Sequence, residues 1–327
     1  MKLGYKASAE QFGPVELLEL SRHAERVGLE IVAVSDHFQP WRHHGGHGPA
    51  ALSWLGAAAV ATERAALGTS VLTPTLRYHP TVVAQSFATL GCLAPGRVFL
   101  GVGTGEAMNE TPATGQEFPG RKERRQRLAE AIRLIRRLWT EERVDFEGDW
   151  YRTSKATIYD RPEQPVPIYV AASGPLAAKL AGRAGDGFIC TSGKDPALYE
   201  ELLGKVAEGA EAAGRDAAAI RRMIEVKVSY DRDARRALDN CRWWAALALT
   251  PEQKEGIEDP IEMERLADAN ADRAHTRFIT SNDPEEIVAG IRRYADLGFD
   301  ELILHAPGED QARFLDQFAE DVLPLFA

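Results

Sequence analysis

The sequence predicts a (β/α)8 barrel. Eight short, continuous apolar runs alternate with amphipathic stretches along the 327 residues. Continuous apolar runs suit parallel strands that helices cover on both faces, and eight strand–helix units fit a chain of this length. A doubly wound parallel sheet produces the same alternation, so the pattern alone leaves that architecture open.

The predicted elements follow one another in regular order. The strands are expected at 2–8, 31–36, 67–75, 97–103, 166–172, 187–192, 223–230 and 301–306. Helices are expected at about 14–27, 51–63, 80–93, 120–140, 174–183, 196–213, 283–297 and 309–325. Pro14 suits a first helical turn, and Gly28 is placed to end that helix. Apolar residues in 120–140 recur at spacings of three and four, which predicts one buried helical face.

Two segments are too long for simple connections between a strand and a helix. They are 104–120, after the fourth strand, and 231–280, before the eighth. Long loops that follow barrel strands gather at the C-terminal face, where sites are built. We therefore expect one domain over 1–327, with a helical insertion at about 231–280.

Composition excludes several classes of protein. The net charge is −10 and the basic residues are dispersed, which argues against a nucleic-acid partner or an anionic membrane surface. No apolar run approaches the length of a membrane span. The three cysteines are far apart and form no CxxC, so neither disulfides nor a cysteine zinc site is indicated. A cytoplasmic protein is expected.

The stretch "VSDHFQPWRHHGGHGP" (34–49) holds four of the eight histidines. His37 directly follows a predicted strand, where it could act as an acid or base or simply bond to a neighbour. His43, His44 and His47 lack the spacing of a helical metal site and lie among glycines and prolines. We expect no metal there and assign these three no role.

Three more strand ends carry candidate groups. "GVGTGEAMNE" (101–110) misses the dinucleotide fingerprint, but its glycines would let a flat ring approach the backbone. "AASGPLAAKLAG" (171–182) opens a helix whose exposed N–H groups could bind phosphate. "CTSGK" (190–194) places a hydroxyl and a lysine after a strand.

Taken together, these strings resemble the F420-dependent glucose-6-phosphate dehydrogenases of the bacterial-luciferase-like superfamily. "GYKASAEQF", "SDHFQPW", "GVGTGEAMNE", "AGRAGDGFICTSGK" and "LTPEQK" carry the resemblance, which runs over nearly the whole chain. It implies a (β/α)8 barrel with insertions, a homodimer, coenzyme F420 (a 5-deazaflavin hydride acceptor) and no metal. The implied reaction moves a hydride from the anomeric carbon of glucose-6-phosphate to F420 and gives 6-phosphogluconolactone.

The resemblance also implies roles for individual residues. Contacts to F420 and its phosphate-bearing tail would fall on Asp36, Thr73, Thr104, Gly105, Asn109, Ser173, Gly174 and Leu176, beside a cis peptide at Ser70-Val71. Thr191, Lys194, Lys254 and Arg277 would hold the substrate phosphate. The catalytic set would be His37, Glu106, Trp41 and Glu10.

The resemblance leaves some functional choices open. His37 is the expected base and Glu106 the acid or electrostatic partner, although the two roles could be exchanged. Trp41 would shape the pocket and Glu10 would support the base. Fructose or mannose 6-phosphate could replace glucose-6-phosphate as the substrate. An FMN or F420 oxidoreductase of the same superfamily is the other enzymatic reading, and a cofactor-binding protein without turnover is the third.

Overall fold

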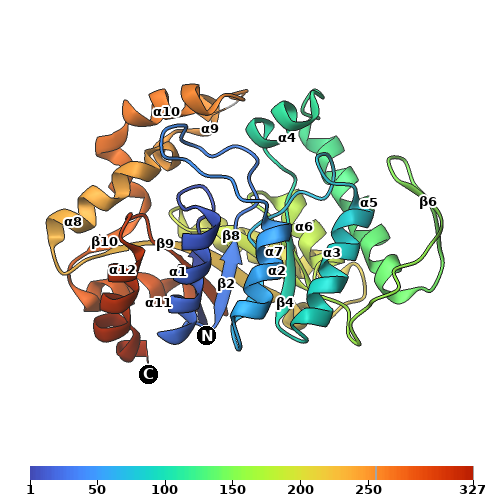
Figure 1. Cartoon of the computed structure of the whole chain (residues 1–327), viewed down its shortest axis with the longest axis horizontal. Coiled ribbons are helices and arrows are strands. Elements are labelled where there is room, and N and C mark those ends of the chain that lie inside the picture. The colour runs from blue at the N-terminus through green and yellow to red at the C-terminus, as the bar shows by residue number, and fades with distance from the viewer. Residues whose placement is uncertain (255, 327) are drawn as a thin grey trace.

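A closed barrel of eight parallel strands forms the centre of the computed structural model, which describes residues 1–254 and 256–326 (Figure 1). Around the barrel the strands run in the order β1-β2-β3-β4-β7-β8-β9-β11, and β11 pairs with β1. Their bounds are Lys2–Ala7 (β1), Ile31–Val34 (β2), Ala66–Thr69 (β3), Val98–Val102 (β4), Ile168–Ala171 (β7), Gly187–Thr191 (β8), Arg221–Tyr230 (β9) and Glu301–His305 (β11). The predicted barrel is confirmed, and the doubly wound sheet is wrong.

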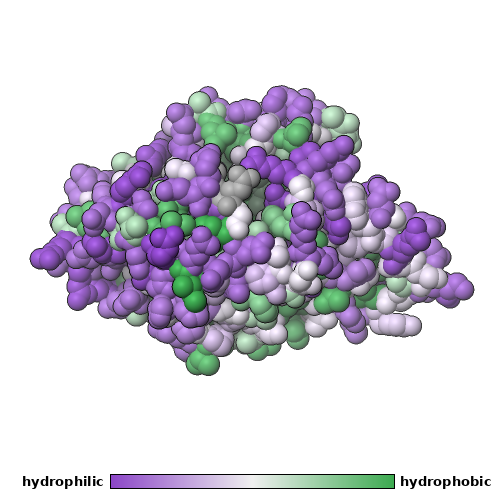
Figure 2. All heavy atoms as spheres, turned by 90° about the horizontal axis from the view of Figure 1, so that it is seen from above, coloured by the Kyte–Doolittle hydropathy of each residue, from purple (hydrophilic) through white to green (hydrophobic). Residues whose placement is uncertain are grey.

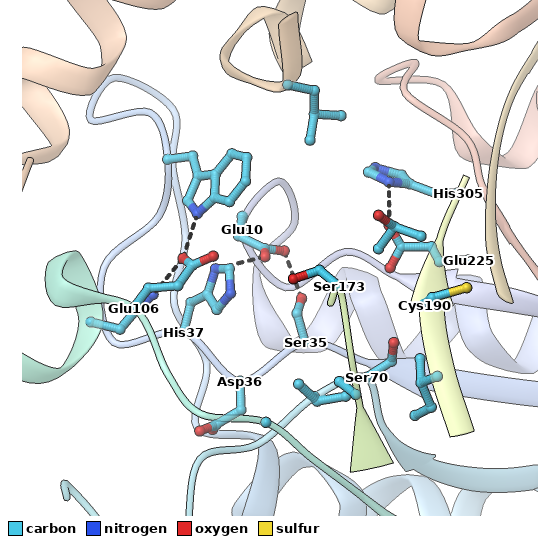
Figure 3. Close-up of a pocket in the computed structure, with 18 of the residues that line it drawn as sticks. Glu10, Ser35, Asp36, His37, Ser70, Glu106, Ser173, Cys190, Glu225 and His305 are labelled. Carbon is cyan, nitrogen blue, oxygen red and sulfur yellow. Dashed lines mark hydrogen bonds and ion pairs between the residues drawn. The ribbon is translucent and has the colours of Figure 1, made fainter. Parts of the chain in front are cut away.

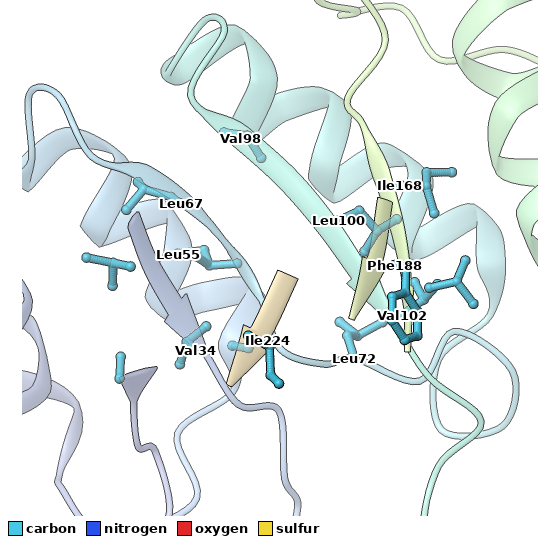
Figure 4. Close-up of a cluster of buried hydrophobic side chains, with 14 of the residues drawn as sticks. Val34, Leu55, Leu67, Leu72, Val98, Leu100, Val102, Ile168, Phe188 and Ile224 are labelled. Carbon is cyan, nitrogen blue, oxygen red and sulfur yellow. The ribbon is translucent and has the colours of Figure 1, made fainter. Parts of the chain in front are cut away.

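Helices cover the outside of the barrel. They are α1 (Pro14–Arg26), α2 (Ala51–Ala61), α3 (Pro80–Leu93), α5 (Arg121–Thr140), α6 (Pro175–Ala184), α7 (Pro196–Glu211), α11 (Pro284–Asp296) and α12 (Gln311–Gln317). Proline begins most of them because its fixed φ suits the first turn. Gly28, with φ of 106°, follows the end of α1. Apolar side chains such as Leu55, Leu67 and Leu100 fill the layer between helices and strands (Figure 4).

Further elements rise above the C-terminal end of the barrel (Figure 1). Within 104–120 lies α4 (Ala107–Thr114). Within 231–280 lie α8 (Ala234–Asp239), a 3-10 segment (Asn240–Ala248), α9 (Pro251–Lys254), α10 (Pro260–Asp268) and a second 3-10 segment (Ala271–Arg277). At the end of this range begins β10 (Ile279–Ser281), which pairs with β9. Met108 of α4 packs in one apolar cluster with residues of this segment.

Some predicted bounds were wrong. The expected strand 67–75 ends at Thr69, after which the Ser70-Val71 peptide is cis and Leu72 makes only an isolated bridge to Val102. The strand expected at 31–36 ends at Val34. The last helix is α-helical only to Gln317, and π and 3-10 turns follow it. A β-hairpin, β5 (Val144–Glu147) with β6 (Arg152–Ala156), was not predicted.

Alternate residues of each strand point into the barrel and form layers. The lower layers are apolar and include Ile31, Phe99, Tyr169, Met223 and Ile303. Glycines lie among them: a Cβ at Gly187 would fall 2.6 Å from the Tyr169 ring. Two residues further along β9 and β11 the inward positions become charged or polar. The interior is thus a filled core below and a polar pocket above.

Two glycines allow the backbones of α6 and α7 to approach each other closely. A Cβ at Gly182 would lie 1.9 Å from the Val206 carbonyl oxygen, and one at Gly209 would lie 2.2 Å from the Lys179 carbonyl oxygen. Backbone atoms cannot move aside as a flexible side chain can. The two helices therefore pack backbone to backbone at these points.

We predict that Gly182→Ala lowers the free energy of unfolding by about 1–3 kcal/mol, because the added methyl group forces the two helices apart. Gly204→Ala is the matched control, since its Cβ would meet nothing within 4 Å and its position in α7 is exposed. That change should stabilise the protein by about 0.5–1 kcal/mol. Denaturant unfolding of both variants tests this, and equal stabilities would contradict it.

Candidate active site

The C-terminal face of the barrel opens into a cavity of about 650 Å³. Residues at the ends of the strands form its floor and walls, and residues of the 231–280 segment, among them Trp244 and Leu249, complete the lining. Seen from above, polar side chains make up most of the rim of this face (Figure 2). A polar hollow above an apolar core is where a barrel positions its chemistry.

Most of the predicted site residues line this one cavity. Gly174 and Leu176 do not belong to the lining, and Leu176 is 57% exposed. The residues brought together are Glu10, Asp36, His37, Trp41, Ser70, Val71, Thr73, Thr104, Gly105, Glu106, Asn109, Ser173, Thr191, Lys194, Lys254 and Arg277.

Glu10 and His37 form an ion pair in the wall of the cavity (Figure 3). His37 Nδ1 lies 2.8 Å from Glu10 Oε1, with its N–H poorly aligned to the carboxylate, and the Ser35 hydroxyl donates to Glu10 Oε2 at 2.6 Å. Burial opposes the charge on both partners, but the pairing outweighs it. It lowers the pKa of Glu10 to about 2, and with the charge of Glu106 it raises the pKa of His37 to about 9.

Trp41 and Glu106 form a second wall of the cavity. Trp41 Nε1 donates to Glu106 Oε2 at 3.2 Å, and the Trp41 ring lies nearly parallel to the His37 ring, with 6.3 Å between centroids. Asn109 accepts hydrogen bonds from the backbone N–H groups of Phe38 and Gln39 at 2.8 and 3.1 Å. The segment that contains Glu106 therefore also fixes the loop that carries His37 and Trp41.

Asp36 lines the cavity, but its carboxylate is already bonded. Arg77 Nη2 donates to it at 2.6 Å, the Ala51 N–H at 3.2 Å and the Tyr78 hydroxyl at 3.3 Å. Its side chain extends away from Glu10 and His37 (Figure 3). In the structure Asp36 ties the start of α2 to the loop after β3.

The loop histidines hold the β2–α2 loop in place. The backbone N–H groups of His43 and His44 donate to Glu264 Oε2, and His44 Nδ1 lies 2.9 Å from the same oxygen. The His47 N–H donates to the Glu10 carbonyl oxygen at 2.8 Å. Across residues 1–254 and 256–326, no group of three or more His, Cys, Asp or Glu side chains is placed to hold a metal ion.

Three cations also line the cavity: Lys194 and Arg277 on the side of β8, and Lys254 beside Trp41. Within the described chain, Lys194, Lys254 and Arg277 form no ion pair with a carboxylate, and Arg277 Nε is buried without a hydrogen-bond partner. Lys254 Nζ instead lies 4.7 Å from the centre of the Trp41 ring. Burial and neighbouring cations outweigh the charge of Glu106 and lower the pKa of Lys254 to about 8, and burial also lowers the pKa of Lys194.

Four polar residues of the floor were missed from the sequence. Lys6 Nζ lies 2.9 Å from Glu225 Oε2 and also donates to the Ser70 carbonyl oxygen, and Glu225 contacts His305 and Lys227. A signal for them was present. A lysine in "LGYKAS" and the alternating charges of "IEVKV" interrupt strands that are otherwise continuously apolar, and such charges are buried only when they are paired.

The floor beside Val71 has room for a flat ring. Gly103 and Val71 both line the cavity, and a Cβ at Gly103 would lie 2.7 Å from Val71 Cγ2. The glycine therefore leaves open a space that any side chain would fill. The Ser70-Val71 peptide is cis, as the resemblance implies. Ser173 and Thr104 add hydroxyl groups to the same cavity. These residues fit a deazaflavin.

Comparisons with known proteins agree with this description. Residues 1–301 match the model of the luciferase-like monooxygenase family. The chain is 61% identical to the F420-dependent glucose-6-phosphate dehydrogenase of Intrasporangium calvum, with 99% of this chain and 98% of that protein covered. It is 60% identical to the protein of the same name from Kineococcus radiotolerans, with 99% and 97% covered.

A solved structure, the F420-dependent secondary alcohol dehydrogenase in complex with an F420-acetone adduct, superposes with a TM-score of 0.93 at 36% identity. The superposition covers 100% of this chain and 99% of that one. The chain therefore belongs to the luciferase-like monooxygenase family and, within it, to the F420-dependent glucose-6-phosphate dehydrogenases.

Proposed function

We propose that this protein transfers a hydride from the anomeric carbon of glucose-6-phosphate to coenzyme F420 and gives 6-phosphogluconolactone. One observation carries the proposal: a single cavity holds a histidine–carboxylate pair together with three cations that, within the described residues, have no carboxylate partner. A sugar phosphate needs both, a proton acceptor at its anomeric hydroxyl and positive charge at its phosphate.

Several lining residues would hold F420. Ser70, Val71 and Gly103 would support the flat ring, with Thr73, Thr104, Gly105 and Asn109 beside it. Ser173 would contact the tail, and Gly174 and Leu176 at the start of α6 would extend that contact outside the cavity. Asp36 would contact F420 from the edge of the cavity. When bound, F420 supplies the hydride acceptor.

Thr191, Lys194, Lys254 and Arg277 would bind the phosphate of the substrate. A bound phosphate dianion would offset the mutual repulsion of the three cations. Guanidinium and ammonium groups also donate strong charge-assisted hydrogen bonds to phosphate oxygens. This local excess of positive charge explains how a chain of net charge −10 can bind an anion.

His37 would take the proton of the anomeric hydroxyl, and Glu10 would stabilise the imidazolium that forms. Glu106 would act on the cofactor side as an acid or electrostatic partner, with Trp41 holding it by the Nε1 hydrogen bond. The carboxylates, the imidazole and the indole are all fixed before the substrate arrives. Such preorganisation lowers the cost of charge development.

We also infer that the chain acts in the cytoplasm as a homodimer of one-domain subunits. The outer surface of α2 and α3 exposes Val60, Val82 and Leu93, and α2 carries no charged residue. Such an apolar face suits a second copy of the chain.

The cytoplasmic location rests on a cysteine. Cys92 is free and exposed, which is typical of a reducing compartment. Over the described residues, no helix is long and apolar enough to cross a membrane.

The first test mixes the enzyme, F420 and glucose-6-phosphate. We expect the absorbance of the oxidised deazaflavin to disappear. Fructose and mannose 6-phosphates define the selectivity. The absence of bleaching with every hexose phosphate would contradict the proposal, and tight binding of FMN by the purified protein would favour a flavin oxidoreductase instead.

The second prediction concerns pH. If neutral His37 is the base, kcat/KM should rise with pH, and the midpoint of the rise should lie near the His37 pKa of about 9. Glu10→Gln removes the largest influence that raises this pKa, so the rising limb should move to lower pH. Glu211→Gln, an exposed position on α7, is the control and should leave the profile unchanged. A limb that falls through pH 9 would assign proton donation to His37 instead.

The third prediction separates the substrate from the cofactor. Lys194→Ala should raise the Michaelis constant for glucose-6-phosphate by about tenfold or more, since one charge-assisted hydrogen bond contributes about 1.5–3 kcal/mol. The affinity for F420, followed by its fluorescence, should change far less. Lys205→Ala, on the outside of α7, is the control. A loss of F420 affinity as large as the loss for the substrate would contradict this assignment of Lys194.

A further inference from the structure

The order of strands around the barrel places two residues between the ends of the proposed substrate site. Thr191 ends β8 and Lys194 follows it, whereas Glu10 follows β1 and His37 follows β2. Between β8 and β1 stand β9 and β11, in that order. Lys227 of β9 and His305 of β11 are register partners on these strands, and both line the cavity. His37 follows β2, which stands opposite β8. Because Val71 and Gly103, which would hold the F420 ring, follow β3 and β4, a sugar between His37 and Lys194 is left the side of β9 and β11.

His305 carries an unused polar atom at this position. The residue is 2% exposed, and its Nδ1 lies 3.3 Å from Glu225 Oε1. Its Nε2 is buried and has no hydrogen-bond partner in the described part of the chain. The ring faces the same space as Glu10 and His37 (Figure 3). An unpaired buried nitrogen is costly, so its presence in a cavity wall needs an explanation.

The neighbours of His305 determine which tautomer it adopts. The charges of Lys6 and Lys227 and a hydrogen bond from His305 overcome burial and keep the pKa of Glu225 well below its usual range, so its carboxylate can only accept. His305 Nδ1 therefore carries the hydrogen. Burial lowers the pKa of His305, which keeps the ring neutral and leaves Nε2 with a free lone pair.

The ring is also fixed in orientation. Trp244 meets it edge to face, with 4.4 Å between ring centroids and an interplanar angle of 86°, and Phe278 lies at 5.9 Å. With Nδ1 bonded to Glu225, the ring cannot turn without losing that bond. Nε2 is thus a rigid hydrogen-bond acceptor buried in the wall of the cavity that His305 lines.

We propose that His305 Nε2 accepts a hydrogen bond from a ring hydroxyl of the sugar, at C2, C3 or C4, and that Glu225 positions His305 for this contact. The inference rests on the proposed function and deepens it, since it makes His305 a residue that determines which hexose 6-phosphates are used. A hydroxyl is the matching donor because the phosphate, a dianion without hydrogen, would be repelled by a lone pair.

Two substitutions separate the contact to the substrate from the contact to Glu225. In His305→Asn the side-chain amide can replace Nδ1 and keep the bond to Glu225, but nothing replaces Nε2. In His305→Gln the longer side chain can place an amide oxygen where Nε2 lies. Asparagine should therefore lose the sugar contact, and glutamine should restore part of it.

The experiment is a cycle of two changes, one in the protein and one in the sugar. Wild type, His305→Asn and His305→Gln are each measured with glucose-6-phosphate and its 2-, 3- and 4-deoxy analogues. The readouts are kcat/KM and, in protein free of F420, the dissociation constant of each sugar phosphate by calorimetry. Comparison between variants cancels the effect of each deoxy change on the intrinsic reactivity of the sugar.

In wild type we expect one deoxy analogue to bind about five- to tenfold more weakly than glucose-6-phosphate, the size of one hydrogen bond. In His305→Asn that difference should vanish, while the affinities for F420 and inorganic phosphate stay unchanged. His305→Gln should recover part of it. If removing that hydroxyl weakens binding by the same factor in wild type and in every variant, the inference is overturned. Failure of wild type to reduce F420 with glucose-6-phosphate would instead contradict the proposed function.

The wild-type protein alone also tests the inference. If none of the three deoxy analogues loses affinity for wild type, no hydroxyl is bound and the proposal fails, whatever the variants do. Thermal unfolding of His305→Asn confirms that it is folded. A variant that loses stability and affinity for F420 together would also count against a role confined to the sugar.

Discussion

Lys6 lies between two buried carboxylate–histidine pairs, and the mouth of the barrel depends on it. Its ammonium group contacts Glu225 at 2.9 Å, donates to the Ser70 carbonyl oxygen and helps to lower the pKa of Glu10. Both carboxylates are almost fully buried, and each is paired with a histidine. Buried charges are tolerated only when opposite charges and hydrogen bonds replace water. One cation thereby holds the two sides of the floor and the start of the cis peptide.

The polar mouth depends in turn on the apolar layers below it. Small residues such as Gly68, Gly101 and Gly187 let the strands and the rings of Phe99 and Tyr169 close the bottom of the barrel. A closed floor excludes water from beneath the charged layer, and the low polarity strengthens each charge–charge contact above it. The long loops then need only complete the upper walls.

Much of this arrangement is predictable from the chain. Continuous apolar runs gave eight strands, and resemblance of short motifs gave most of the cavity lining, including His37 and Lys194. Boundaries were harder because an apolar run continues past the end of pairing, as after Thr69. Lys6, Glu225 and His305 were missed although their charged or polar side chains interrupt apolar strands, because the sequence does not show which of them are partners. Closure of the barrel brings them together from β1, β9 and β11, and no local pattern encodes that.

His37 and His305 are each paired with a buried glutamate, but their pKa values are shifted in opposite directions. Each contacts one buried carboxylate, but the surroundings of that carboxylate differ. Glu10 acts on His37 together with a second carboxylate, Glu106, so the pKa of the imidazole rises to about 9. Glu225 is shared with two lysines, which weakens its effect on His305, and burial therefore lowers the pKa of that ring. One histidine is thus suited to exchange a proton and the other to remain a neutral acceptor.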